Sequence, residues 1–196
     1  MSAEQQLAAF EIDLTRLHRR TVSSFYSNLV TRPTGRAVRL GVEQQLLASG
    51  RGGTCVSILD FSQVRVLDYS CADEIVAKLL LRYSASDRPL DAYFIARGLK
   101  EHHLESVEAV LERHSLLLAA EEAGSPPRLL GPADSVERGC WQEMVRRGRA
   151  RLGELINATG ASPARTRSVA QRFLSRRVAV ELPDGALAAL PQLNDG

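Results

Sequence analysis

The sequence predicts an α/β domain followed by a small helical domain, and three observations support this. Short apolar runs alternate with helical patterns over about residues 10–120, which implies a sheet with helices packed on it. A proline- and glycine-rich segment, AGSPPRLLGPADS at residues 123–135, then interrupts the pattern. Three further helical patterns and two short apolar runs follow it. We therefore predict domains at 1–122 and 136–196, with a junction at 123–135.

Composition is that of a soluble globular protein. Of the 196 residues, 44% are hydrophobic and 24% charged, enough for an ordinary core. No apolar run reaches the roughly 18 to 20 residues that cross a bilayer, and residues 1–6 are polar where a signal peptide would be basic and then apolar. Cys55, Cys71 and Cys140 lack CxxC spacing. We expect a cytoplasmic protein with reduced cysteines, no membrane contact and no cofactor.

The first domain opens with Phe10, Ile12 and Leu14 at period two, which predicts a short strand. A helix is expected over residues 15–30, broken by TRPTGR at 31–36. A second helix carries apolar residues at helical spacing and ends at Gly50. The run TCVSILDF, residues 54–61, is rich in β-branched and apolar residues, which is typical of a strand buried on both faces.

Another helix, strand and helix are predicted after that buried strand. Either Asp68 or Ser70 can cap the first helix, whose inner stripe comprises Ile75, Val76, Leu79 and Leu80. AYFIA at 92–96 is a second buried strand, and the helix after it carries Leu104, Val107, Val110 and Leu111. Residues 116–120 and 128–130 could pair as a hairpin across the junction.

The second domain reads as helix, helix, turn, helix and hairpin. Its helices are expected over 136–149, 152–159 and from Pro163 to about Arg176, with Ser162 as the last helix's N-cap. Strands at 178–182 and 186–190 flank a turn with aspartate and glycine. This order is typical of a winged helix.

The stretch LDFSQVRVLDYSCADEIV, residues 59–76, resembles the core of a STAS domain, the fold of anti-anti-sigma factors. In that family a strand ending in LDLS leads through a short loop to an Asp-Ser-Ser-Gly turn and a helix. The resemblance covers about residues 10–120 and places Asp68 on the motif aspartate, Tyr69 on its first serine and Ser70 on the serine that anti-sigma-type kinases phosphorylate. Cys71 stands in the place of the glycine. A kinase or ATPase of that type is thus an implied partner.

The sequence around Ser70 allows three roles for this residue: helix cap, phosphate acceptor or nucleophile. Neither a GxSxG turn nor a histidine partner can be placed near it, which disfavours the nucleophile and, with it, an enzyme. A phosphate at a helix N-terminus would be stabilised by free N–H groups, while the acids Asp68, Asp73 and Glu74 would repel it. The sequence predicts a contact surface made of Ser70 and those three acids.

Metal binding is a weaker alternative at two places. Asp60, Asp68, Asp73 and Glu74 could gather around a divalent ion, although Asp60 can simply cap its own turn. His102 and His103, flanked by Glu101 and Glu105, lack the i, i+4 spacing of a metal-binding helix face. We expect neither group to hold a metal.

The second domain resembles winged helix-turn-helix DNA-binding domains over about residues 134–193. Charge favours this: residues 138–180 hold ten arginines against Glu143 and Glu154. On the helix after Ser162, one face is formed by Thr166, Val169, Ala170, Phe173 and Leu174. The opposite face offers groove-reading and phosphate-binding side chains, because arginine pairs with guanine and glutamine with adenine. The predicted DNA-binding residues are Arg165, Arg167, Ser168, Gln171, Arg172 and Arg176.

These features together predict a bacterial regulator in which a STAS-like domain receives a signal from a protein partner and a winged helix binds double-stranded DNA. A homodimer would suit a palindromic site. The alternative is a protein-interaction or scaffold protein of an anti-sigma-type partner switch, without DNA binding. Glu181 and Asp184 favour this alternative, because they make the hairpin acidic.

Overall fold

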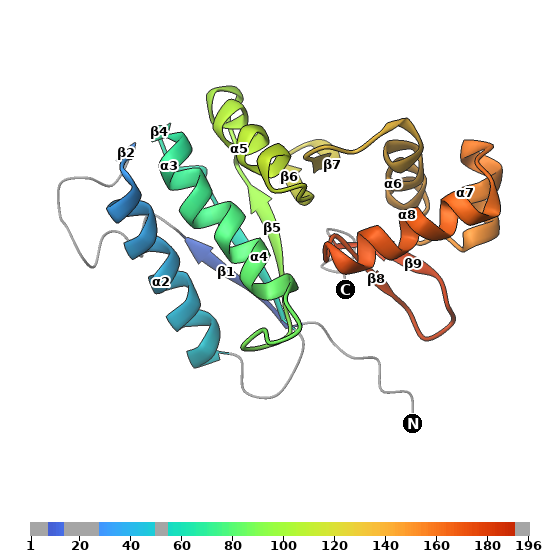
Figure 1. The fold of residues 1–196 in the computed structure, drawn as a ribbon, viewed down its shortest axis with the longest axis horizontal. Coiled ribbons are helices and arrows are strands. Elements are labelled where there is room, and N and C mark those ends of the chain that lie inside the picture. Colours follow the sequence, from blue (N-terminus) through green and yellow to red (C-terminus); the bar gives the residue numbers. More distant parts are fainter. Residues whose placement is uncertain (1–7, 14–27, 50–54, 191–196) are drawn as a thin grey trace.

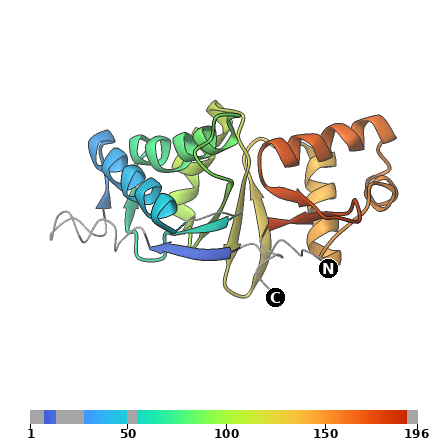
Figure 2. The same cartoon turned by 90° about the horizontal axis from the view of Figure 1, so that it is seen from below.

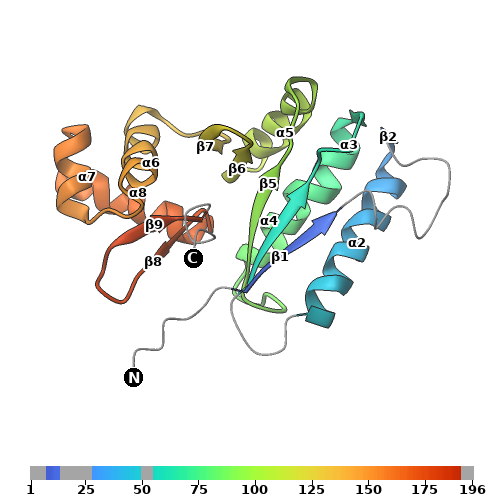
Figure 3. The ribbon, with the colours of Figure 1, turned by 180° about the vertical axis from the view of Figure 1, so that it is seen from behind.

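The computed structural model describes residues 8–13, 28–49 and 55–190. Its first part contains a five-stranded sheet in the order β1-β3-β5-β6-β7 (Figures 1 and 3). Four strands run parallel, and β7 is antiparallel to β6. The strands are β1 Ala8–Asp13, β3 Cys55–Asp60, β5 Ala92–Arg97, β6 Leu118–Glu122 and β7 Ser125–Leu130.

Helices form a single layer on one face of this sheet (Figure 2). Parallel strands that follow one another in both sequence and space, joined by right-handed crossovers, must carry their helices on the same face. The short parallel pair β2 Asn28–Leu29 and β4 Val66–Leu67 lies beside this layer. The layer comprises α2 Arg32–Ser49, a continuous helix built from α3 Tyr69–Ala72, η1 Asp73–Ala77 and α4 Lys78–Ser84, and α5 Glu101–Arg113.

The predicted strand at residues 54–61 is confirmed, because Cys55 to Leu59 are buried on both faces of β3. The predicted inner stripe Ile75, Val76, Leu79 and Leu80 is also buried. The strand at 92–96 and the helix after it are confirmed as β5 and α5, with Leu104 partly buried. The sequence predicted these elements correctly because the apolar pattern of each one lies within a few consecutive residues.

One expectation at the start of the chain was wrong, and a second is contradicted only at its end. TRPTGR does not break a helix but begins one, since α2 starts at Arg32; Pro33 in the first turn costs no helical hydrogen bond. Gly35 lies so close to the helix opposite that a Cβ there would be 2.9 Å from Cys71 Cα. The helix expected over 15–30 lies outside the described residues up to position 27, and Asn28–Leu29 form a strand instead.

The second part of the chain has the predicted order of elements. Ser162 caps α8 by accepting a hydrogen bond from the Arg165 N–H at 3.2 Å. Ala150 forms an antiparallel bridge to Leu187, which adds a short third strand to the hairpin. The elements are α6 Ser135–Arg147, α7 Leu152–Thr159, α8 Pro163–Ser175, β8 Ala179–Glu181 and β9 Leu187–Ala189.

The junction predicted at 123–135 is largely structured. The hairpin expected across it is present, with Leu118 opposite Leu130 and Ala119 opposite Leu129. Residues 125–130 are therefore an edge strand of the sheet, and only residues 131–134 separate β7 from α6. The boundary between the two parts is a tight connection.

The two parts share a hydrophobic core. Val56 and Ile95, on the sheet face opposite the helices, belong to the same buried cluster as Trp141 and Phe173 of the C-terminal part. Arg177 reinforces the joint. Its guanidinium lies 3.8 Å from the centre of the Tyr93 ring, pairs with Asp91 and donates to the Ala92 carbonyl at 2.9 Å. We infer that the C-terminal part is docked on the sheet and does not swing freely.

Candidate functional site

Asp68 caps the helix that begins at Tyr69. Its Oδ1 accepts a hydrogen bond from the Cys71 N–H at 2.7 Å, and its Oδ2 accepts one from the Thr31 N–H at 2.9 Å. Of the two capping candidates, Asp68 is therefore the cap and Ser70 is not. Ser70 lies one residue inside the helix and is partly exposed, and its hydroxyl has no hydrogen-bond partner among the residues that the structure describes.

Cys71 is a packed residue with an inert thiol. It is fully buried, and its Sγ donates to the Thr31 carbonyl at 3.0 Å. Burial, followed by the neighbouring Asp68 carboxylate, raises the pKa of Cys71 to about 12. A thiol with that pKa stays protonated at neutral pH and is a poor nucleophile.

Asp73 and Glu74 do not lie on the surface, contrary to the expected contact surface. Their residues are 7% and 2% exposed, and they sit on a π-helical turn, a feature often found at functional sites. Basic side chains of α2, α4 and α5's C-cap surround them. Asp73 lies 2.7 Å from Arg32 and 3.0 Å from His114. Glu74 lies 3.1 Å from Arg32 and 3.4 Å from Arg39, and it also pairs with Lys78.

This arrangement, the Asp73–Glu74 cluster, changes the character of the surface around Ser70. The two carboxylates are buried and neutralised, while the Arg32 side chain is 49% exposed. Arg113 is exposed and donates to the Tyr69 hydroxyl at 3.0 Å. Arginines, more than acids, thus face solvent at this end of the helix layer. The sequence could not show these partners, because Arg32 and Asp73 are 41 residues apart.

The four acids proposed as a divalent-ion site are not gathered together. Asp60 Oδ1 accepts from the Ser62 N–H at 2.8 Å and so caps its own turn. Within residues 8–13, 28–49 and 55–190, no three histidine, cysteine or acidic side chains are grouped as a metal site would need. His103 is buried and its pKa is lowered to about 4, mainly by burial, whereas His102 is exposed and contacts the Arg65 carbonyl.

The Asp73–Glu74 cluster should make stability depend on pH in the acid range. Burial alone would raise both carboxyl pKa values, but hydrogen bonds from Arg32 and His114 to Asp73, and from Lys78, Arg32 and Arg39 to Glu74, lower them. A lowered folded-state pKa gives stability that is complete above the unfolded value of about 4 and lost as pH falls below it. In urea unfolding from pH 2 to 7, the free energy of unfolding should therefore fall less at low pH in Glu74→Gln than in the wild type.

The control for that measurement is Glu122→Gln, which removes an exposed carboxylate on the β6–β7 hairpin. The free energy of unfolding of this control should fall at low pH as much as that of the wild type. The same fall in Glu74→Gln as in the wild type would contradict the ion pairing assigned to Glu74.

The inner face predicted for α8 is confirmed. Thr166, Val169 and Phe173 are fully buried, and Ala170 and Leu174 are partly buried against the same core. On the opposite face Arg167, Ser168 and Gln171 are exposed, and Arg176 at the C-terminal end is partly exposed. The side chains of these four residues have no hydrogen-bond or ion-pair partner in the described part of the chain, so they are free to bind a ligand.

Arg165 and Arg172, also predicted to read DNA, form ion pairs with residues at the start of α6. Arg172 pairs with the buried Glu137 at 2.6 Å and donates to the Pro132 carbonyl at 3.1 Å. Arg165 pairs with Asp134. Asp134 and Glu137 form the capping box of α6, so the start of α6 holds both arginines. The spacing DSVE at 134–137 is the sequence signature of such a box and could have been recognised.

Ion pairs neutralise much of the basic stretch that the sequence singled out. Seven of its ten arginines contact a carboxylate, namely 146 and 147 with Glu143, 149 and 151 with Asp184, 165 with Asp134, 172 with Glu137 and 177 with Asp91. The acidic turn of the hairpin is thereby partly neutralised as well. Arg138, Arg167 and Arg176 are the arginines of this stretch without a carboxylate partner among the described residues, and two of them lie on the α8 surface, defined as Arg167, Ser168, Gln171 and Arg176.

Comparison of the chain with protein-family models, with curated proteins and with solved structures returned no match. None of the helices in the described ranges has the length and apolar character needed to span a bilayer. The functional argument therefore depends on the side chains and their geometry.

Proposed function

We propose that this protein is a regulator whose C-terminal part is a winged helix that binds double-stranded DNA through α8. The observation that carries the proposal is the α8 surface. Arg167, Ser168 and Gln171 project from a helix whose other face is buried, and their side chains have no hydrogen-bond or ion-pair partner within the described ranges. Arginine and glutamine on one exposed helix face are suited to guanine and adenine edges in the major groove.

The elements around α8 support a winged-helix arrangement. Three helices precede the β8–β9 hairpin, and the bridge from Ala150 to Leu187 adds a strand segment between α6 and α7. Arg176 caps the C-terminal end of α8, where it could contact a phosphate beside the groove. Arg165 and Arg172 orient α8 by their pairs with α6 and are not assigned to DNA.

The N-terminal part would receive the signal as a STAS-like domain. Its support is the parallel sheet with all its helices on one face, together with the LDFSQVRVLDYSCADEIV motif. The Ser70 hydroxyl is partly exposed and has no hydrogen-bond partner in the described part of the chain, and Arg32 and Arg113 expose positive charge at the same end of the helix layer. A phosphate placed on Ser70 by an anti-sigma-type kinase would be favoured by that charge.

A second candidate function is protein interaction without DNA. The observation that favours it is the pairing of seven of the ten arginines with carboxylates, which leaves Arg167 and Arg176 as the free cations of α8. A DNA-binding surface usually gains most of its affinity from many phosphate contacts. Two free arginines would give weak, salt-sensitive binding.

Fluorescence anisotropy with a mixed-sequence duplex at low salt separates the two functions. We expect the wild type to bind at micromolar concentration and Arg167→Ala to bind several-fold more weakly, because one phosphate or base contact is lost. Arg82→Ala is the control, since it removes an exposed arginine from α4 in the other part of the molecule. No binding by the wild type would favour the protein-interaction function.

A further inference from the structure

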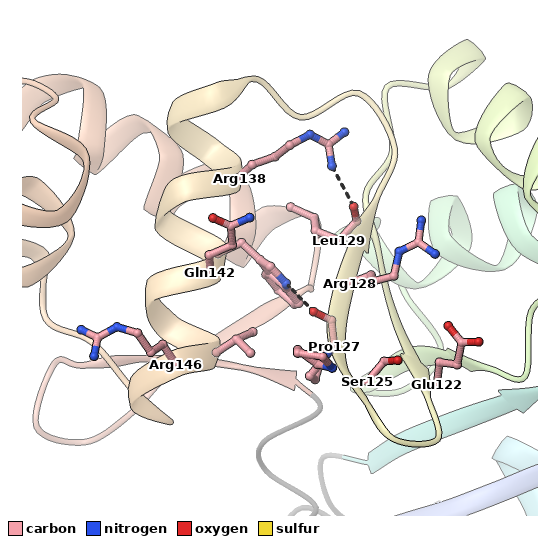
Figure 4. Close-up of a pocket in the computed structure, with 11 residues that line it drawn as sticks. Glu122, Ser125, Pro127, Arg128, Leu129, Arg138, Gln142 and Arg146 are labelled. Carbon is pink, nitrogen blue, oxygen red and sulfur yellow. Dashed lines mark hydrogen bonds between the residues drawn. The ribbon is translucent and has the colours of Figure 1, made fainter.

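A groove lies between the β6–β7 hairpin and α6, where the two parts of the chain meet (Figure 4). Its volume is about 960 Å³, at the upper end of the range for small-molecule sites. We call it the hairpin groove. Pro126, Pro127 and Leu129 of β7 and Trp141 and Val145 of α6 supply its apolar wall.

Arg138 is a polar residue of this groove whose side chain is fixed by hydrogen bonds. It reaches from α6 to β7 and donates to the Leu129 carbonyl at 3.1 Å and the Gly131 carbonyl at 3.2 Å (Figure 4). Carbonyls orient a guanidinium without cancelling its charge, and among the described residues no carboxylate pairs with it. An arginine has five N–H donors, so donors remain for an incoming anion. Gln142, one turn further along α6, is exposed on the same wall.

Among the charged side chains near the groove, Arg138 is the one best placed to bind an anion. Arg146 points away from β7 and pairs with Glu143 at 2.7 Å (Figure 4). Arg128 and Glu122 also line the groove, but they carry opposite charges and lie across β7 from Arg138 in the same view. The anionic group of a ligand is therefore expected beside Arg138, and the apolar part of that ligand against Pro126 and Pro127.

The main chain of β7 excludes an extended peptide as the natural occupant. An added strand would need the outward-facing carbonyls of β7, but Pro127 already accepts from the Trp141 indole at 3.4 Å, and Leu129 accepts from Arg138. Pro126 and Pro127 also lack the N–H that a strand ladder requires. Edge strands are commonly protected from strand addition in this way. Recognition in the groove must proceed through side chains.

We propose that the hairpin groove binds a small organic anion, whose carboxylate pairs with Arg138 and whose apolar body lies against Pro127 and Trp141. Such a ligand would touch both parts of the chain at once. It would also touch α6, whose capping residues Asp134 and Glu137 hold Arg165 and Arg172 of α8. The groove is thus placed to transmit ligand binding to α8, but binding itself does not depend on the DNA-binding function.

The chain has a single tryptophan, and it lines the groove, so ligand binding can be followed by the emission of Trp141 in the folded protein. The probes are phenylacetate, benzoate and hexanoate, with phenylacetamide as the uncharged counterpart of phenylacetate. We expect at least one carboxylate to change the emission saturably and phenylacetamide to bind at least about 10-fold more weakly, as expected when a charge-assisted hydrogen bond is lost.

Two variants locate the site. Arg138→Gln should weaken the best carboxylate at least about 10-fold, and so should Gln142→Glu, which puts a like charge on the exposed wall without touching β7. Arg149→Gln, on the loop between α6 and α7, is the control and should bind as the wild type does. Urea unfolding establishes which variants are folded.

Three results would overturn the proposal: no saturable change with any of the three carboxylates at millimolar concentration, equal affinity for phenylacetate and phenylacetamide, or unchanged affinity in both site variants. Binding of an acidic hexaglutamate peptide where all three carboxylates fail would also overturn it, and would assign the groove to a protein partner. None of these results bears on DNA binding by α8.

Discussion

Replacing Arg172 with alanine is expected to lower the free energy of unfolding by about 3 kcal/mol, because it leaves a buried carboxylate without its cation. Glu137 is only 1% exposed, and Arg172 lies 2.6 Å from it. The loss should appear in urea unfolding at neutral pH. Arg167→Ala is the matched control on the same helix, since Arg167 is exposed and has no ion-pair partner among the residues described. Its effect should stay within about 0.5 kcal/mol.

A double-mutant cycle separates ion pairing from other effects of the substitution. Adding Glu137→Ala to Arg172→Ala removes the unpaired carboxylate, so the two losses should be clearly less than additive. Strictly additive losses, or an Arg172→Ala protein as stable as the control, would contradict the structural role of Arg172. The distinction matters for function, since lost DNA binding in an Arg172 variant would reflect a displaced α8.

Replacing Phe173 with alanine is expected to cost about 3 to 5 kcal/mol, the usual range for a large aromatic removed from a core. Phe173 is fully buried, and its ring packs edge to face on Trp141 with 6.2 Å between centroids. It belongs to the cluster that also contains Val56 and Ile95 of the sheet. The loss should therefore destabilise the joint between the two parts and not the C-terminal part alone.

Unfolding followed with two probes tests this shared core. Tryptophan emission reports on the C-terminal part, and far-ultraviolet circular dichroism reports on the whole chain. Both transitions should move together to lower urea in Phe173→Ala, whereas Leu40→Ala, at a 43% exposed position, should barely move either. A shift of the tryptophan transition alone would show that the two parts unfold independently.

The predictions that succeeded rest on local patterns. Ser162 and Pro163 mark the start of α8 because N-cap and first-turn preferences act within a few residues. The buried strand β3 was recognised by its β-branched run, and the inner face of α8 by its spacing. The start of α2 was misplaced because a proline can begin a helix as well as end one.

The candidate sites were harder to predict because long-range partners decide their chemistry. Arg172 looks like a groove-reading residue on the helix, and only the fold brings Glu137, 35 positions away, against it. Asp73 and Glu74 looked like an exposed acidic patch, but the fold brings Arg32 and Arg39 of α2 against them. Arg167, Ser168 and Gln171 were identified correctly as exposed, because their orientation follows from helical geometry alone.

The salt dependence of duplex binding tests the proposed DNA contact of α8 most directly. Each phosphate contact that is lost should reduce the slope of log K against log salt by nearly 1. We expect the double variant Arg167→Ala/Arg176→Ala to bind more weakly, with a slope smaller by about 1 if Arg167 contacts a base and by about 2 if it contacts a phosphate. Arg82→Ala should keep the wild-type slope. Absence of wild-type binding at low salt, or a slope that the double variant leaves unchanged, would contradict the assignment of α8 to DNA.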